Sequence, residues 1–465
     1  MRGDFSRLTF NPRKRYTRVW MQQGRVLLDA DWNEQADIQA YYLRALVVDL
    51  IGAYGGPRDN CGFAISVHDG EKRSGQSKPG AGDFFIGRGR YYVGGLLCEN
   101  ERSCLFSAQP NASPALLTAG SYLVYLDVWE RQITFLEEPA MREVALGGPD
   151  TTTRSQLVWL VKALPLDIDR PYIPSFLASL YWRSWLKQSW RLWLEKLQPA
   201  NRGQLKVTCD EVMEAVRPAG TGGYRGLENH FYRVEIHTGS QGGKGAAPTF
   251  KWSRDNGSVA AAILHITADE RADTTIIELD PNRCGARFDL RQGNWVEVVE
   301  VHSASQAASG PLYKVLSFDP ESMRATVAGL HHSETGRAHS QRLLLRRWDQ
   351  SEAGVAEGHV ELVAGAVRLA EKNSENENWI PLEEGIFIQF QPGGFYRAGD
   401  YWQFAARSGA QAVEWPTEQD ELGRVAPEAL PPSGSQRHFA PLAVVSMDRN
   451  GKLRITDLRR TFKPV

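Results

Sequence analysis

The amino-acid sequence predicts a mainly β protein of the α+β class, built of several small β domains or barrels. From about residue 83 onward, short runs of β-branched and aromatic residues alternate with Gly- and Pro-rich breaks, which is typical of strands and turns. Helical periodicity marks an N-terminal helix that ends near Gly52 and an amphipathic, Trp-rich helix over residues 175–197. Because 465 residues exceed one ordinary domain, we expect several.

The predicted domain division has four contiguous parts. It comprises an N-terminal strand-and-helix docking module (1–70), a β domain followed by the Trp-rich helix (71–200), a second β domain (201–350) and a C-terminal β domain (351–465). Within the third part, residues 292–330 read as the strands of a small SH3-like or OB-like barrel.

The N-terminal module begins with residues 22–35, which read QQGRVLLDADWNEQ. Gly24 permits the positive φ angle of a turn, and the apolar run 26–28 predicts a buried strand. Asp31 and Glu34 have the spacing of a capping box, with Asp31 as the N-cap of the helix that ends at Gly52. The predicted apolar face of this helix consists of Ile38, Tyr41, Tyr42, Ala45 and Val48.

The stretch 22–35 resembles an uncharacterised bacterial protein family that has a QGRVxLDADWNEQ signature near the N-terminus. Members of that family are found near phage-tail and contractile-injection-system components. Further stretches resemble the same family: 87–100 (GRGRYYVGGLLCEN), 122–131 (YLVYLDVWER), 142–153 (REVALGGPDTTT), 232–237 (YRVEIH), 250–259 (FKWSRDNGSV) and 399–407 (GDYWQFAAR). The resemblance implies a context, a phage-tail-like injection particle, rather than a particular activity.

The second part of the chain carries β signals and then a helix. Residues 90–98 form a hairpin signature, two β-prone runs around Gly94 and Gly95. In the helix over 175–197, Trp182, Trp185, Trp190 and Trp193 fall at helical spacing. Three interpretations remain open: packing on the protein's own β core, a subunit interface, and binding in a membrane interface, the last of which is disfavoured.

The remaining two parts read as short strands separated by Gly-rich breaks. Residues 252–257 (WSRDNG) predict a strand that ends in an Asn-Gly turn, with Arg254 available to pair with Asp255 or with a partner surface. The C-terminal part carries β-prone runs at 360–369, 385–390, 399–405 and 442–446.

Composition excludes several function classes. The 54 basic and 55 acidic residues are balanced, which argues against a general attraction to nucleic acid or to an anionic membrane. The five cysteines show no CxxC pair, so we expect free thiols rather than a zinc site or disulfides. The N-terminal residues lack the apolar segment of a secretory signal, and we therefore expect assembly in the cytoplasm.

The sequence predicts no enzyme and no cofactor. It lacks GxSxG, HExxH and GxxxxGK[ST] strings, and it carries no placed GxGxxG fingerprint. Two candidate metal groups fall short. The carboxylates Asp29, Asp31, Glu34 and Asp37 have a structural explanation in the helix start, and the cluster of His331, His332, Glu334 and His339 lies in a polar loop.

We therefore expect a non-enzymatic structural or adaptor component of a contractile particle, near its baseplate, spike or outer shell. The alternatives are a cargo protein carried by the particle and a carbohydrate-binding module of fibre type. The expected partners are other particle subunits and further copies of the chain, as a trimer or a hexamer. The expected scaffold and interface residues are Arg25, Asp31, Trp32, Glu34, Trp182, Trp185, Trp190, Trp193, Trp252, Arg254, Asp400 and Trp402. Charge reversal at Arg25 or Arg254 should then abolish assembly and leave the chain folded.

Overall fold

The chain folds into two compact units, each assembled from segments that lie far apart in the sequence. The computed structural model describes residues 2–68, 79–110, 112–166, 184, 189–195, 202–209, 223–240, 247–285, 287–300, 309–329, 343–351, 362–369, 379–419, 423, 425–434 and 436–463. The barrel unit comprises Met1–Leu8, Gln132–Ser155 and Ala200–Ser435; the helix unit comprises Thr9–Arg131, Gln156–Pro199 and Gln436–Val465. The units thus differ from the four contiguous parts of the predicted division, because strand pairing joins distant segments.

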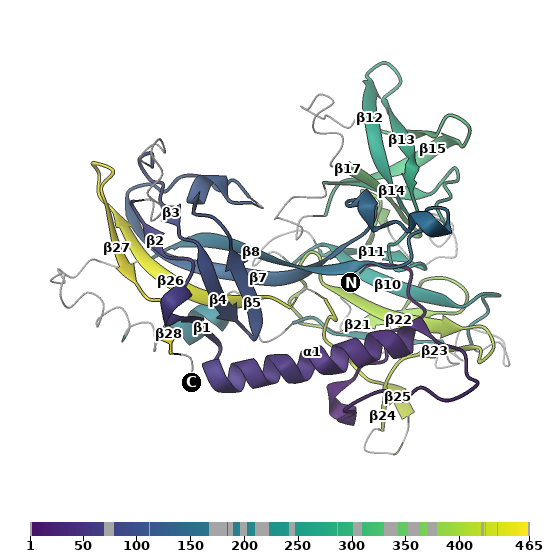
Figure 1. The fold of residues 1–465 in the computed structure, drawn as a ribbon. Coiled ribbons are helices and arrows are strands. Elements are labelled where there is room, and N and C mark those ends of the chain that lie inside the picture. Colours follow the sequence, from purple (N-terminus) through teal and green to yellow (C-terminus); the bar gives the residue numbers. More distant parts are fainter. Residues whose placement is uncertain are drawn as a thin grey trace. The chain divides into compact units, whose positions relative to one another are not determined.

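The helix unit contains one long α-helix and three β-sheets (Figure 1). Its labelled helices are η1 (Pro12–Lys14), α1 (Asp29–Ile51), η2 (Arg58–Asn60) and η3 (Phe106–Ala108), and the described residues 189–195 are also helical. Its strands are β1 (Tyr54–Pro57), β2 (Ile65–Ser66), β3 (Phe85–Ile86), β4 (Gly89–Val93), β5 (Leu96–Asn100), β6 (Cys104–Leu105), β7 (Gly120–Ile133), β8 (Arg154–Pro165), β26 (His438–Met447), β27 (Leu453–Asp457) and β28 (Thr461–Phe462). The sheet orders are β28-β1-β4-β5, β2-β3-β6 and β27-β26-β7-β8.

The hairpin predicted around Gly94 and Gly95 is confirmed as β4 and β5. Both glycines have positive φ angles, 58° and 80°. Both also touch neighbouring groups so closely that no Cβ fits. A Cβ on Gly94 would lie 2.1 Å from the ring of His438, and one on Gly95 would lie 2.7 Å from the backbone oxygen of Arg44 in α1. The turn therefore lets the hairpin pack directly against the helix backbone.

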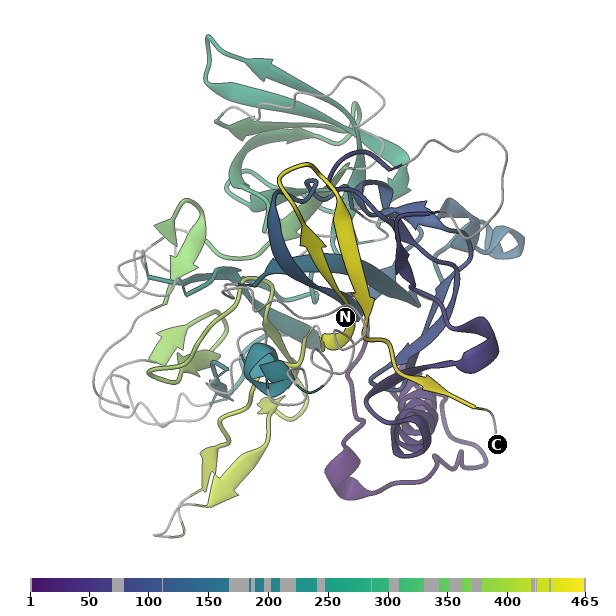
Figure 2. The same cartoon turned by 90° about the vertical axis from the view of Figure 1, so that its left-hand side faces the viewer.

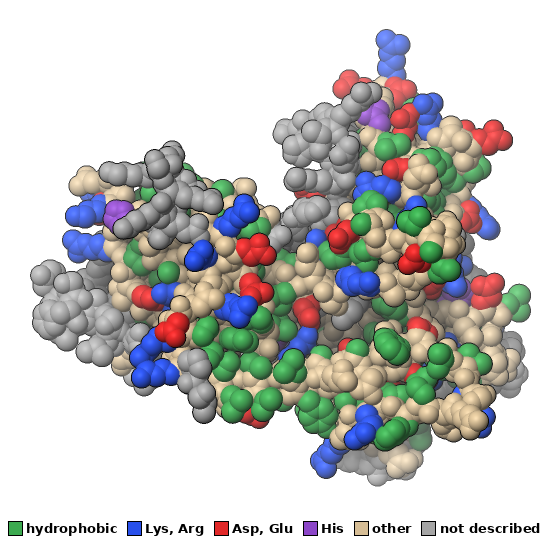
Figure 3. All heavy atoms as spheres, viewed as in Figure 1, with side chains coloured by type: hydrophobic (Ala, Val, Ile, Leu, Met, Phe, Trp, Pro, Cys, Tyr) green, Lys and Arg blue, Asp and Glu red, His purple; other side chains and the backbone are tan. Residues whose placement is uncertain are grey.

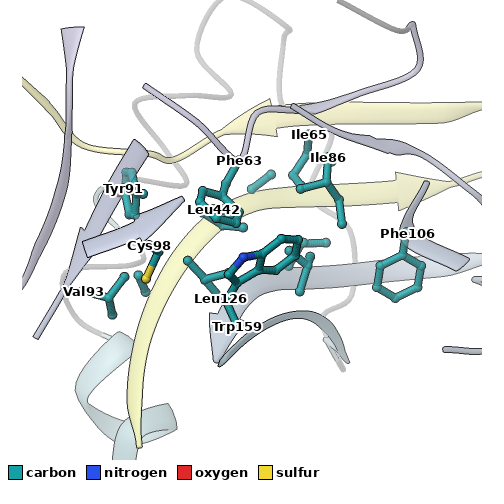
Figure 4. Packing of buried hydrophobic residues seen from close by; sticks show 14 of the residues in the cluster. Phe63, Ile65, Ile86, Tyr91, Val93, Cys98, Phe106, Leu126, Trp159 and Leu442 are labelled. Carbon is teal, nitrogen blue, oxygen red and sulfur yellow. The ribbon is translucent and has the colours of Figure 1, made fainter. Parts of the chain in front are cut away.

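The core of the helix unit draws side chains from all three of its sheets (Figure 4). Phe63 and Trp159 meet edge to face with ring centroids 5.0 Å apart, and the indole nitrogen of Trp159 donates to the carbonyl of Glu99. One of these sheets joins segments from distant parts of the sequence, because β26 pairs with both β27 and β7 (Figure 2). This unit is therefore complete only when its last segment is in place.

The barrel unit contains a six-stranded sheet, a closed six-stranded barrel and two smaller sheets. Its elements are η4 (Pro139–Met141), η5 (Val144–Leu146), β9 (Leu205–Thr208), β10 (His230–Thr238), β11 (Thr249–Ser253), β12 (Ala260–Asp269), β13 (Thr274–Cys284), β14 (Trp295–Glu300), β15 (Leu312–Asp319), β16 (Arg324–Ala328), β17 (Leu343–Trp348), β18 (Leu362–Val363), β19 (Ala366–Arg368), β20 (Trp379–Pro381), β21 (Phe387–Phe390), β22 (Tyr401–Arg407), β23 (Ala412–Glu414), β24 (Thr417–Gln419) and β25 (Val425–Pro427). The three open sheets have the orders β18-β19-β11-β10-β22-β23, β20-β21-β9 and β24-β25.

The barrel confirms the expectation of a small barrel but is larger than predicted. Its closed strand order is β12-β13-β16-β15-β14-β17, so it begins before residue 292 and ends after residue 330. The predicted range contains only β14, β15 and β16. The long hairpin of β12 and β13 and the strand β17 close the barrel, and their pairing is not visible in the local pattern of residues 292–330.

The six-stranded sheet is buried on both of its faces around β10. Trp252 on β11, Val234 on β10 and Trp402 on β22 are direct cross-strand neighbours on one face, in an apolar core. The alternate residues of the same strands, Arg233, Glu235 and Lys251, point to the other face and are also buried. The Asn-Gly turn predicted after β11 is confirmed. Ser258 N donates to the carbonyl of Asp255, and Asn256 and Gly257 have positive φ angles.

Three details of the predicted N-terminal module are corrected or refined. The helix is present and ends at Gly52 as predicted, but it begins at Asp29 with Leu28 as its N-cap. Asp31 is therefore not the cap and the capping box is wrong; Asp29 and Asp31 lie in the first turn, where carboxylates favour the positive end of the helix dipole. The strand predicted at 26–28 is also wrong: these residues pair with no strand and are exposed.

Candidate functional site

The signature stretch 22–35 is largely exposed instead of forming a buried element. Arg25 lies after a turn in which its backbone amide donates to the carbonyl of Gln22, and its side chain is exposed. Trp32 is 78% exposed on the first turns of α1. Large exposed apolar side chains are costly in water unless a partner covers them, so these residues indicate a contact surface.

The exposed side of α1 carries a stripe at helical spacing that is apolar except for Gln39. Its members recur at alternating steps of four and three residues, and all are exposed: Trp32, Ala36, Gln39, Leu43, Leu46 and Leu50. We call this set the α1 seam. Hydrophobic side chains gather along α1 in the space-filling view (Figure 3). The spacing is that of a helix that packs along another elongated element, and the seam spans about 27 Å at 1.5 Å per residue.

The predicted apolar face of α1 only partly matches the buried one. Ile38 is buried, whereas Tyr41 and Tyr42 are about half exposed. The seam on the opposite side was missed, although a helical wheel from Trp32 to Leu50 shows its spacing. Most of α1's apolar surface thus faces solvent.

The buried side of α1 is held firmly to the rest of the helix unit. Glu34, predicted as a capping residue, accepts a 2.5 Å hydrogen bond from Thr9 Oγ1. Gln35 Oε1 accepts from the backbone amide of Val19. Arg44 forms a 2.7 Å ion pair with Glu130 at the end of β7. These contacts fix the orientation of the helix, so the seam is presented on a rigid element.

Trp252 and Trp402 are core residues. Trp402 is fully buried and its indole nitrogen donates to the carbonyl of Leu430; Trp252 is 4% exposed. Asp400 lies at the start of β22 and pairs with Arg202 at 2.7 Å. Burial raises the pKa of Asp400, against the opposing effect of Arg202. These three predicted residues therefore stabilise the sheet and lie away from the surface.

Arg254 belongs to an ion-pair group within the barrel unit. Its Nη2 donates to Glu383 Oε2 at 2.6 Å, and its backbone amide donates to Asp349. The other oxygen of Glu383 accepts from the hydroxyl of Tyr232 at 2.8 Å. Burial raises the pKa of Glu383 to about 7, despite the nearby Arg254. Asp255, the predicted partner of Arg254, pairs instead with Arg347 at 3.0 Å.

A second, more deeply buried charged group in the barrel unit was not predicted. It lies between the charged face of the six-stranded sheet and the barrel strands β14 and β17. We call it the ionic cluster, and its members are Arg2, Arg233, Glu235, Lys251, Glu297 and Arg346. Residues alternate between the two faces of a strand, so β10 has one apolar face and one charged face. The structure covers the charged face with the barrel.

Electrostatics in the ionic cluster are dominated by burial and by close partners. Burial alone would raise the pKa of Glu235, but Arg2, Arg233 and Lys251 lower it well below its usual range. Burial and the neighbouring Arg2 lower the pKa of Arg346 to about 9. The cluster contains four basic and two acidic side chains.

Part of the Trp-rich helix lies outside the described residues, including Trp182 and Trp185. Residues 189–195 are helical. Trp190 is 9% exposed and packs against Tyr125 and Phe439 on the sheet of β7 and β26, with Trp193 partly buried beside it. In this described part, the helix lies on the protein's own β core.

The described residues contain neither a metal-ligand group nor a membrane-spanning helix. Across these parts of the chain, no group of three or more His, Cys, Asp or Glu side chains could hold a metal ion. The predicted histidine cluster at His331, His332, Glu334 and His339 lies outside the described residues. Within the described ranges, no helix is both long and apolar enough to cross a membrane.

Fold and surface together define a mainly β protein of two units, whose segments alternate along the sequence, with an exposed seam on helix α1. The chain belongs to a family described as "Family of unknown function (DUF6519)", whose model matches residues 1–170 and 196–454. Neither a curated protein nor a solved structure matches the chain.

Proposed function

We propose that the chain is a non-enzymatic structural or adaptor component of a contractile, phage-tail-like injection particle, assembled in the cytoplasm. The observation that carries the proposal is the α1 seam. Twelve of the 23 large hydrophobic side chains that are exposed in the described part of the chain lie between residues 16 and 50. Six of these twelve lie on α1 and six on the segment just before it. Such a concentration is expected of a surface that a neighbouring subunit covers.

The seam suits an elongated partner element in another particle subunit. Its apolar residues supply the buried centre of a contact, and Arg25 and Asp49 supply charged groups at its margin. Aromatic anchors such as Trp32 are the residues that contribute most to binding when a partner buries them. Because the resembled signature covers the beginning of this surface, the same stretch links the family resemblance to the docking role.

The test uses a tagged copy of the full chain in the organism that encodes it. Particles are collected by sedimentation, examined by electron microscopy, and probed for the tag by immunoblotting. We expect the wild-type chain to co-sediment with tail-like particles. The double variant Leu43→Asp and Leu46→Asp should lower the incorporated amount at least tenfold, because charges in the seam prevent its burial.

The matched control is Leu227→Asp in the barrel unit, where Leu227 is 96% exposed and lies outside the seam. This control should enter particles as the wild type does. Circular dichroism should show that all three proteins fold alike. Absence of the wild-type chain from particles would sink the proposal, and so would normal incorporation of the seam variant.

A second candidate, a cargo protein carried by the particle, is favoured by Glu383. A carboxyl group with a pKa near 7, hydrogen-bonded to Tyr232 and Arg254, has the properties of a general acid or base. If the chain is a cargo, its expression in a target cell should slow growth, and Glu383→Gln should remove that effect. Growth that is unaffected by the wild-type chain would count against this candidate.

A further inference from the structure

The ionic cluster contains more positive charge than its own carboxylates neutralise. Among the described residues, the carboxylates that act most strongly on Arg2, Arg233, Lys251 and Arg346 are Glu235 and Glu297. Burial of a net charge of this size is costly unless another charged group compensates it.

Both carboxylates are already engaged. Glu297 accepts from Lys251 Nζ at 2.7 Å, from the indole nitrogen of Trp348 at 2.8 Å and from the backbone amide of Gly310 at 2.8 Å. Glu235 accepts from Arg2 at 2.7 and 2.9 Å and from Arg233 at 2.6 Å. Among the ion pairs between described residues, none joins Arg346 to either carboxylate.

Arg346 is the least satisfied cation of the cluster. It is 8% exposed, and its Nε donates to the carbonyl oxygen of Gly257 at 3.1 Å. Its Nη1 is buried and has no hydrogen-bond partner, and neither does Nε of Arg2. A buried guanidinium group with an unpaired N–H is unusual, because the group carries five donors that normally find acceptors.

Three arginine side chains converge at the Asn-Gly turn. A Cβ built on Gly257 would lie 3.7 Å from the Cδ atoms of Arg2, Arg233 and Arg346 alike. Glycine, with a φ angle of 65°, leaves room for this convergence. The side chain of Arg2 is 27% exposed, so the group is connected to solvent on that side.

We propose that these converging arginines bind a small inorganic anion, chloride or an oxyanion such as phosphate, held by Arg346 Nη1 and Arg2. Guanidinium groups bind such anions with charge-assisted hydrogen bonds, and Arg is preferred for planar, two-point contacts to oxyanions. The anion compensates the excess charge at the interface of sheet and barrel. It enters and leaves along the exposed side chain of Arg2.

The proposal is tested by isothermal titration calorimetry of the full chain at neutral pH. The protein is equilibrated in a buffer whose only anion is gluconate, at constant ionic strength, and is titrated with sodium chloride or with sodium phosphate. We expect saturable binding of about one anion per chain for at least one of the two salts. The salt that saturates distinguishes a halide site from an oxyanion site.

Arg346→Gln keeps an N–H near the carbonyl of Gly257 but removes the charge, and we expect it to weaken anion binding at least tenfold. The matched control is Arg324→Gln on the barrel strand β16, where Arg324 pairs with Glu278 at the exposed surface. This control should bind the anion within about twofold of wild type. Equal affinity in Arg346→Gln would overturn the proposal, as would absence of saturable binding of both salts to the wild type.

A second measurement covers the case in which Arg346→Gln does not fold. Crystals of the wild-type chain are soaked in sodium bromide, or grown with selenate in place of phosphate, and their anomalous scattering is measured. A peak within hydrogen-bonding distance of Arg346 Nη1 supports the proposal. Well-diffracting crystals with no peak at this position for either ion contradict it.

Discussion

Helix α1 and strand β10 show opposite outcomes for two amphipathic patterns. The sequence predicts that α1 buries an apolar face, and a charged strand face such as that of β10 is ordinarily solvated. In the structure, α1 leaves Trp32 and Leu43 in solvent, whereas Arg233 and Glu235 on β10 are 3% and 1% exposed. Periodicity thus identifies the type of an element but not what covers each of its faces, because the covering element comes from elsewhere in the chain or from another molecule.

The strongest way to test the β10 side of this comparison is to remove one carboxylate from the ionic cluster. Glu235→Gln leaves Arg2, Arg233 and Lys251 without their shared partner. We expect it to lower the free energy of unfolding by about 3–5 kcal/mol, as for other broken buried ion pairs. Urea denaturation followed by tryptophan fluorescence measures the change.

Glu278→Gln is the matched control for this experiment, because Glu278 forms an exposed pair with Arg324. Its effect should stay within about 0.5 kcal/mol. If both variants lose the same small amount, the charged face of β10 does not contribute to stability as its burial implies.

Charge reversal at two arginines distinguishes an exposed residue, Arg25, from a residue that stabilises the fold, Arg254. Arg25→Glu should leave the free energy of unfolding within about 0.5 kcal/mol of wild type, because its side chain is exposed. Arg254→Glu places a carboxylate beside Glu383 and Asp349, and we expect a loss of about 2–3 kcal/mol. Chemical denaturation of both variants measures the difference. If the two variants are equally stable, the ion pairs of Arg254 do not stabilise the fold.

The third prediction concerns the pH dependence that Glu383 imposes on the barrel unit. Its pKa is about 7 in the folded chain and near the ordinary 4.5 when unfolded. Between these two pH values the folded state keeps a proton on Glu383 that the unfolded state releases. The contribution of Glu383 to the free energy of unfolding is therefore fully present below pH 4.5 and is lost as the pH rises through 7. Relative to Glu383→Gln, the wild-type free energy of unfolding should fall by about 3 kcal/mol across this range. Parallel pH profiles for the two proteins would refute the assignment.

Much of the fold could be predicted from local sequence. The Gly94-Gly95 hairpin, the Asn-Gly turn at Asn256, the end of α1 at Gly52 and the mainly β class follow from turn chemistry and residue preference. The closure of the barrel and the two interleaved units could not be predicted, because they depend on pairings such as β26 with β7. The spacing of Asp31 and Glu34 also led to a wrong prediction, that of a capping box. The helix starts earlier there, and Glu34 binds Thr9 instead.

The candidate site residues likewise divide into those that local sequence could predict and those that it could not. The sequence pointed to Arg25 and Trp32 as contact residues, and their exposure accords with that role. It also singled out Trp252 and Trp402, whose large apolar side chains fill the core, since a tryptophan suits either a core or an interface. Arg346 gave no local signal, because its importance arises from Arg2 and Gly257, which are brought to it only by folding.

The pairing of β26 with β7 has a consequence during protein synthesis. Arg437 and Asp127, which form an ion pair next to these strands, are 310 residues apart in the chain. At roughly 5–20 residues per second, a ribosome needs about 15–60 s to supply the missing strand. During that time one edge of β7, rich in buried apolar residues, has no partner strand and is open to wrong pairing. A chaperone that shields this edge until translation nears its end should therefore raise the yield of correctly folded chain.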